Sequence, residues 1–115
     1  MEDTQLYKIK RRLGISFQDT EEDLLLEDLY DDASSYFMGL ANVDFVDSKY
    51  NYILESVVYK MYQRKGSEMI QSESVDGYSV TYLDWEDLFK PYAKIIARDF
   101  YEDGSYREKG KVKFI

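Results

Sequence analysis

Hydrophobic residues along most of the chain recur at the three- and four-residue spacing of amphipathic helices. The first such stretch covers residues 4–13, and Gly14 follows it where a left-handed C-cap ends a helix. The second begins at Asp19 or Thr20, and Asp23 lies three residues after Thr20, as in a weak capping box. The apolar stripes are Leu6, Ile9 and Leu13 in the first stretch, and Leu26, Leu29, Ala33, Tyr36, Phe37 and Leu40 in the second.

Two further helices are predicted after a loop over residues 42–47. The third has Ser48 as its cap and ends near Gly66; it is apolar over nearly half its circumference, so we expect it at the centre of a bundle. The fourth is capped by Asp84, and Pro91 breaks it because proline removes a backbone donor and clashes with the preceding turn. The apolar positions are Tyr50, Ile53, Leu54, Val57, Val58 and Met61, then Trp85, Leu88, Phe89, Tyr92, Ile96 and Phe100.

Between the third and fourth helices the pattern changes to one that favours strands. Residues 69–75 and 78–83 flank Asp76 and Gly77, a dipeptide suited to a two-residue type I′ turn. We therefore expect a protruding β-hairpin over residues 69–83, and because an isolated hairpin is marginal in water it must lean on the bundle or on a partner. Its candidate interface residues are Ser72, Glu73, Ser74, Asp76, Gly77, Tyr78 and Tyr82.

The last residues form a basic arm. After a turn over residues 102–105, cations alternate with other residues, so an extended backbone would place all four on one side. The arm is either a disordered terminus or a strand-like segment that docks on another subunit, and the sequence leaves both open. The candidate contacts are Tyr106, Arg107, Lys109, Lys111, Lys113 and Phe114. The predicted organisation is one mainly α domain of about four helices over residues 1–101, followed by an arm over residues 102–115.

The composition excludes several kinds of chemistry. The 115 residues contain no cysteine and no histidine, which removes thiol and Ser-His catalysis, zinc sites built on these ligands and disulfides. No apolar run approaches the roughly 20 residues that cross a bilayer, and the acidic start does not resemble a secretory signal. Twelve tyrosines are many for this length. They suit protein interfaces or the edges of an amphipathic core, and both interpretations stay open.

Acidic charge is concentrated in the first half. Residues 1–59 hold 5 basic and 13 acidic side chains, a net charge of −8, whereas residues 60–115 hold 10 of each. The second helix carries a run of acids without one basic neighbour: Glu21, Glu22, Asp23, Glu27, Asp28, Asp31 and Asp32. Like charges at this spacing cost helix stability, so the run is either a solvated face or a functional one. Tight DNA binding is not expected, because it requires a basic footprint.

Neither a metal site nor a phosphate loop can be assembled from the sequence. The region from Asp28 to Asp32 lacks the glycine and the distal glutamate of a calcium loop. The six glycines are scattered singly, so no nucleotide fingerprint exists. We therefore expect no cofactor, no metal and no catalysis.

Two segments carry a resemblance to a known family. They are Tyr59-Lys60-Met61-Tyr62-Gln63-Arg64-Lys65-Gly66-Ser67-Glu68, followed by Ser72-Glu73-Ser74-Val75-Asp76-Gly77-Tyr78-Ser79-Val80. The chain resembles the head-tail connector proteins of long-tailed phages and prophages, over about residues 5–101. The start, Leu6-Tyr7-Lys8-Ile9-Lys10-Arg11-Arg12-Leu13-Gly14-Ile15, is also similar. Met69 stands where the family often has a second glycine, and the basic arm matches no family pattern.

The resemblance implies a structural subunit and not an enzyme. Such adaptors form a ring beneath the portal protein, typically twelve-fold, which extends the DNA channel and docks a stopper or tail-completion protein. DNA would pass without specific binding, and an acidic wall formed by Glu21, Glu22, Glu27, Asp28, Asp31 and Asp32 would let it slide. We expect the protein in the virion neck, and in the host cytoplasm during assembly. Two alternatives are an acidic DNA-mimic or inhibitor protein and a carboxylate-dependent metalloenzyme.

Overall fold

The computed structural model describes residues 3–72 and 81–101, with side chains for residues 3–64 and 81–101. These residues are mainly helical and contain no β-strand. The elements are α1 (Asp3–Leu13), α2 (Asp23–Ala41), the 3-10 turn η1 (Ser48–Tyr50), α3 (Asn51–Ser72), α4 (Tyr82–Phe89), the 3-10 turn η3 (Lys90–Tyr92) and α5 (Ala93–Phe100).

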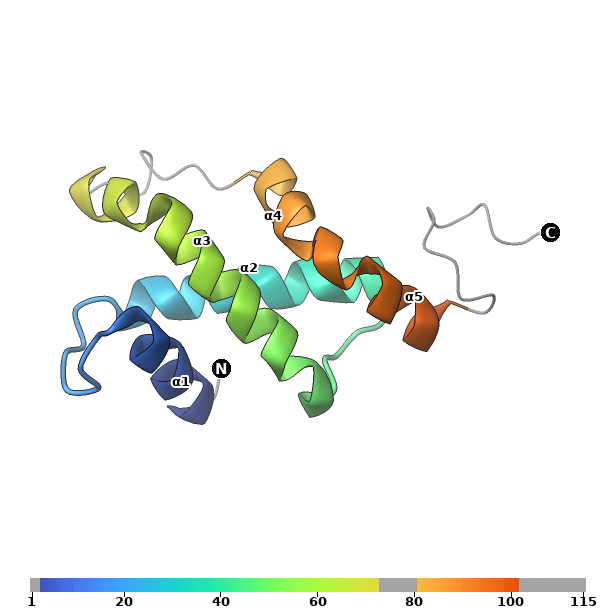
Figure 1. Ribbon diagram of the computed structural model, residues 1–115, viewed down its shortest axis with the longest axis horizontal. Coiled ribbons are helices and arrows are strands. Elements are labelled where there is room, and N and C mark those ends of the chain that lie inside the picture. The colour runs from blue at the N-terminus through green and yellow to red at the C-terminus, as the bar shows by residue number, and fades with distance from the viewer. Residues whose placement is uncertain (1–2, 73–80, 102–115) are drawn as a thin grey trace.

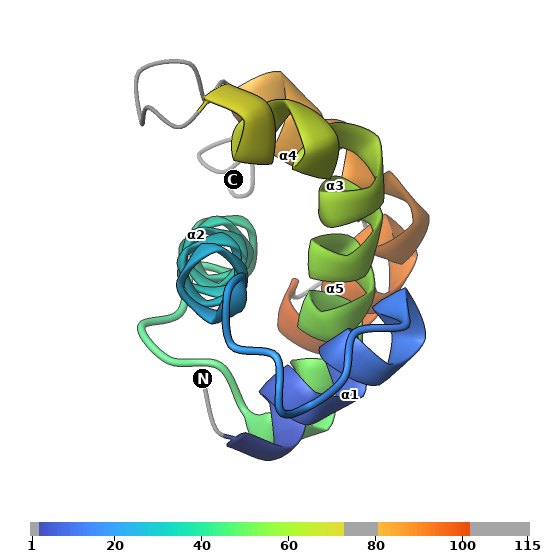
Figure 2. The ribbon, with the colours of Figure 1, turned by 90° about the vertical axis from the view of Figure 1, so that its left-hand side faces the viewer.

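Helix α3 is the central element, as its wide apolar face predicted. It packs against α1, α2 and α4, and it crosses α2 obliquely (Figure 1). In Figure 2 the helix α2 is seen nearly end-on, and the other helices form an arc around one side of it. The opposite side of α2 is therefore not covered by any other helix that the structure describes.

The predicted apolar stripes form one continuous core. All six predicted apolar positions from Tyr50 to Met61 are buried, and Phe37 of α2 contacts the rings of Tyr50, Phe89 and Phe100. The Phe37 side chain is fully buried, so it joins α2 to the C-terminal helices. The core members are Leu6, Ile9, Leu26, Leu29, Tyr30, Ala33, Phe37, Ala41, Tyr50, Ile53, Leu54, Val57, Val58, Met61, Trp85, Leu88, Phe89 and Ile96.

Tyrosine hydroxyls join elements that are distant in the sequence. Tyr92 donates to Ser56 Oγ at 2.9 Å, and Tyr101 donates to the Leu40 carbonyl at 2.8 Å. Tyr50 donates to Asp99 at 2.7 Å; burial first, and then this bond, raises the pKa of Tyr50 to about 12. Several tyrosines thus lie at the core edge with a polar tip at the surface.

The break at Pro91 is confirmed. Helix α4 ends at Phe89, Pro91 lies in the 3-10 turn η3, and α5 starts at Ala93. Proline has no backbone N–H. In the first turn of a helical segment this N–H would have no partner within the helix, so a proline costs little there. The two short helices are therefore separate elements, and each presents its own apolar face to the core.

The predicted β-hairpin over residues 69–83 is wrong at both ends. Helix α3 does not end near Gly66 but continues through Met69 to Ser72, and α4 already begins at Tyr82. One glycine inside a helix costs only about 1 kcal/mol, which does not stop a helix already anchored by its core. The remaining predicted hairpin residues Glu73, Ser74, Asp76, Gly77 and Tyr78 lie outside the described residues.

Three predicted helix starts are also displaced. Helix α2 begins at Asp23, after Glu22 and not at Asp19 or Thr20. Asp47, rather than Ser48, caps the turn η1 by accepting from the Lys49 amide. The cap of α4 is Thr81, whose hydroxyl accepts from the Asp84 amide while the Asp84 carboxylate accepts from Thr81 N, a complete capping box.

The end of α1 is as predicted. Gly14 adopts φ +78, and the bonds Gly14 N to Arg11 O (3.2 Å) and Ile15 N to Lys10 O (2.9 Å) form a Schellman motif. This motif turns the chain into the loop that leads to α2.

Candidate interaction surfaces

The acidic run of α2 is divided by the fold. Asp28, Asp31 and Asp32 are exposed, and none of them makes an ion pair with a described residue. Glu21 is exposed in the preceding loop, and Glu27 is half-buried. Helix α2 itself has one side that the other described helices leave open (Figure 2).

The electrostatics of this face are those of crowded like charges. Partial burial, followed by repulsion from Asp28 and Asp31, raises the pKa of Asp32 above its usual value. Ionising Asp32 therefore costs free energy in the folded chain. Because no cation of the described residues compensates it, the three aspartates form a concentrated negative surface.

Glu22 has a different role from the other acids. Its carboxylate accepts a hydrogen bond from the Tyr62 hydroxyl of α3. Burial first, and then this hydrogen bond, raises the pKa of Tyr62. Glu22 thus fastens the start of α2 to α3 and contributes less to a free acidic surface.

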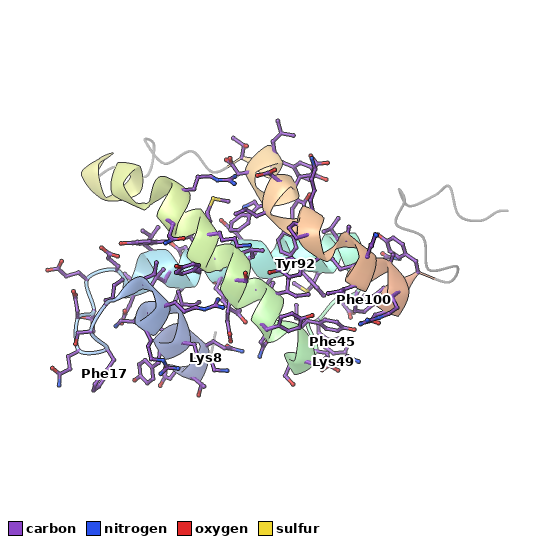
Figure 3. All side chains as sticks on the ribbon, viewed as in Figure 1. Lys8, Phe17, Phe45, Lys49, Tyr92 and Phe100 are labelled. Carbon is purple, nitrogen blue, oxygen red and sulfur yellow. The ribbon has the colours of Figure 1, made fainter. Side chains whose placement is uncertain are left out.

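Large apolar side chains are exposed in several separate places, and one of them is Leu24 near the start of α2, which is 76% exposed. Tyr7 and Phe17 meet edge to face with ring centroids 5.9 Å apart, beside Ile15. Tyr82 and Leu83 are exposed at the start of α4. Figure 3 shows Phe45 in the α2–η1 loop, far from Phe17, and Tyr52 is exposed at the start of α3.

A polar hollow lies between α1 and the start of α3. Lys8 and Lys49 lie on its two sides (Figure 3), and the buried Glu55 also lines it. The other lining residues are Thr4, Gln5, Ser48, Asn51 and Tyr52. Its wall therefore carries both signs of charge.

Only two predicted hairpin contacts fall on described residues. Ser72 ends α3, and Tyr82 opens α4 with 66% of its surface exposed. The arm residues Tyr106, Arg107, Lys109, Lys111, Lys113 and Phe114 lie outside the described residues.

The fold also gives a structural role to Lys10. Its side chain is 1% exposed, and its ammonium donates to the carbonyls of Phe17 at 3.2 Å and Asp19 at 2.6 Å. It also pairs with Asp23 at 2.8 Å. The signal in the sequence is its spacing, because Lys10 lies four residues after Leu6 and next to Ile9, at the edge of the apolar stripe.

The described part of the chain contains no group of three or more acidic side chains placed to hold a metal ion. Within that part no helix is long and apolar enough to cross a membrane. What these residues present is instead a set of charged and apolar surfaces suited to contacts with other macromolecules.

The comparison with known families agrees with this picture. The sequence profile of one family, described as phage gp6-like head-tail connector protein, matches residues 3–98. No curated protein and no solved structure matches the chain. The matched residues include the five α-helices that the structure describes, except the end of α5, and the family consists of structural proteins rather than enzymes. The chain therefore belongs to the phage gp6-like head-tail connector family, as a structural component of the virion at the junction of head and tail.

Proposed function

We propose that copies of this chain form a closed ring beneath the portal, extend its DNA channel and offer a docking face to the stopper or tail-completion protein. The observation that carries the proposal is the family match over residues 3–98. The portal of such phages is typically twelve-fold, and a ring that matches it needs a head-to-tail contact between two different surfaces of each subunit. Assembly takes place in the host cytoplasm, before the tail joins the head.

The acidic face of α2 provides the channel wall in this proposal. Asp28, Asp31 and Asp32 make no ion pair with a described residue, and the pKa of Asp32 is raised by partial burial and then by its two neighbours. A ring would repeat this charge around the lumen, where it repels phosphates and lets DNA slide without adhering. Glu21 and Glu27 add to the face, whereas Glu22 is engaged by Tyr62.

The other predicted contacts are the C-terminal arm and the segment between α3 and α4. The arm carries Arg107, Lys109, Lys111 and Lys113 at alternate positions, which suits a docking segment for an acidic neighbour. Tyr82 at the start of α4 is an exposed aromatic side chain, which supports a contact near the segment between α3 and α4.

Light scattering of the chain alone and with its cognate portal tests the ring. We expect the free chain to be monomeric at micromolar concentration and the portal to recruit many copies, because nucleation on the portal keeps premature assembly rare. A chain that binds no portal would contradict the proposal.

The channel wall is tested separately by titration with duplex DNA at low and moderate salt. The wild-type chain should show no salt-dependent binding, because its acidic side chains outnumber its basic ones and give a net charge of −8, which repels phosphates. A clear complex at moderate salt would refute the acidic wall and leave the ring untouched.

A further inference from the structure

One of the exposed apolar groups lines a hollow with a cationic wall. Tyr7, Arg11, Ile15 and Phe17 line it, and we name it the basic hollow. Tyr7 and Arg11 lie four residues apart on one face of α1, and Lys8 is exposed beside them. Arg11 makes no ion pair within the described residues. The hollow therefore offers apolar surface and an unneutralised positive charge together.

Hydrogen bonds hold the backbone of the loop that carries Phe17. The buried Lys10 ammonium binds the Phe17 and Asp19 carbonyls, and the Asp19 amide donates to the Ser16 carbonyl at 2.9 Å. The Schellman motif at Gly14 fixes the entry to the loop. An exposed aromatic ring on a fixed backbone loses little conformational entropy when it binds, which favours a binding surface.

A second apolar group has the opposite charge. Leu83 of α4 is 70% exposed, and helical spacing places Glu86 and Asp87 on either side of it. Asp87 is paired with Arg64, whereas Glu86 makes no ion pair within the described residues. We name the surface formed by Tyr82, Leu83 and Glu86 the acidic knob.

The acidic knob is also fixed by its surroundings. The capping box of Thr81 and Asp84 sets the start of α4, and the Tyr82 ring packs on Tyr36 of α2 with centroids 5.1 Å apart. Both surfaces are thus rigid, apolar and opposite in charge.

We infer that the acidic knob of one copy docks in the basic hollow of the next copy, with Leu83 against Tyr7 and Phe17 and with Glu86 facing Arg11. This contact rests on the proposed ring and names the two surfaces that build it. The hollow lies on α1 and the following loop, whereas the knob lies at the start of α4, and Figure 1 shows these elements at different edges of the molecule. Two different surfaces give a head-to-tail contact, which closes a ring when the rotation between copies allows it.

Substitutions in both surfaces test the contact on the cognate portal. Phe17→Asp and Leu83→Asp should each raise the concentration needed for half-maximal assembly by about tenfold or more, as expected for a buried apolar anchor. Phe45→Asp is the matched control, because Phe45 is 65% exposed and Phe17 63%, and it should change that concentration by less than about twofold. Circular dichroism checks that each variant is folded.

A charge exchange provides a test that does not depend on the apolar variants. Arg11→Glu and Glu86→Arg should each weaken assembly by about fivefold or more, and the double variant should recover most of the loss because the charges again oppose one another. If the wild-type chain assembles and neither Leu83→Asp nor Phe17→Asp weakens assembly, the contact is refuted. A double variant that recovers none of the loss would refute it as well. In both cases the proposed ring itself would still stand. If the wild-type chain forms no ring on the portal, the proposed function fails and the contact fails with it.

Discussion

Replacing Lys10 by methionine should destabilise the fold by about 3 kcal/mol. Methionine preserves the apolar stem but leaves the Asp23 carboxylate and the carbonyls of Phe17 and Asp19 without their donor. Removing one partner of a buried ion pair costs about 3–5 kcal/mol. The Asp23 side chain keeps 23% exposure and can be hydrated, which places the loss at the lower end of that range.

The loss can be measured as a free energy by urea unfolding and as a fall in Tm by thermal unfolding, both followed by circular dichroism. A domain of this size loses about 4 °C in Tm for each kcal/mol, so Tm should fall by about 12 °C. The control is Lys8→Met, the same substitution two residues earlier at an exposed position, which should stay within about 0.5 kcal/mol of the wild type. A loss below about 1 kcal/mol for Lys10→Met, or an equal loss for both variants, would refute the anchoring role of Lys10.

Three further changes test other parts of the fold. Asp32→Asn should stabilise the chain by roughly 0.3 kcal/mol at pH 7 because a like-charge repulsion is removed, and the gain should vanish as pH falls below the usual aspartate pKa, where Asp32 is protonated in both states. Tyr50→Phe should cost about 1 kcal/mol by removing the bond to Asp99. Since the raised pKa of Tyr50 makes its contribution disappear between pH 10 and about 12, the difference from wild type should shrink over that range. Thr81→Ala should cost about 1 kcal/mol by breaking the capping box with Asp84.

Each of these changes has a clear contrary result. A destabilised Asp32→Asn variant at pH 7 would show that another group stabilises the negative charge of Asp32. A Tyr50→Phe difference that stays constant to pH 12 would show that the hydroxyl titrates normally. An unchanged Tm for Thr81→Ala would show that the cap adds nothing to α4.

The helices were predictable where the core determines them. Val57 and Val58 lie in a stripe so wide that α3 had to be central, and Pro91 breaks the last helix for a reason local to its own ring. The left-handed backbone conformation of Gly14 was also predictable, because it depends on the backbone angles of a single residue. Spacing alone therefore gave the order of the helices, although not the element expected between α3 and α4.

The hairpin prediction is wrong for two local reasons. Gly66 suits the end of a helix, but the tertiary anchoring of α3 outweighs the cost of one glycine. Thr81 and Asp84 have the spacing of a capping box, which starts a helix at Tyr82 where a strand had been expected. The cap was present in the sequence and was assigned to Asp84 instead.

The interaction surfaces were predictable only in part. The acidic run was visible as composition, but the engagement of Glu22 by Tyr62 depends on how α2 meets α3. The basic hollow joins α1 to the loop beyond Gly14, and the acidic knob depends on the true start of α4. Surfaces formed by tertiary packing cannot be obtained from periodicity in one segment.

The most direct test of the connector function is whether phage particles need this chain to join heads to tails. Particles produced without it are examined by electron microscopy and then mixed with the purified protein. We expect filled heads and separate tails in its absence, and joined, infectious particles after the protein is added back. Complete, infectious particles formed without the chain would contradict the connector role.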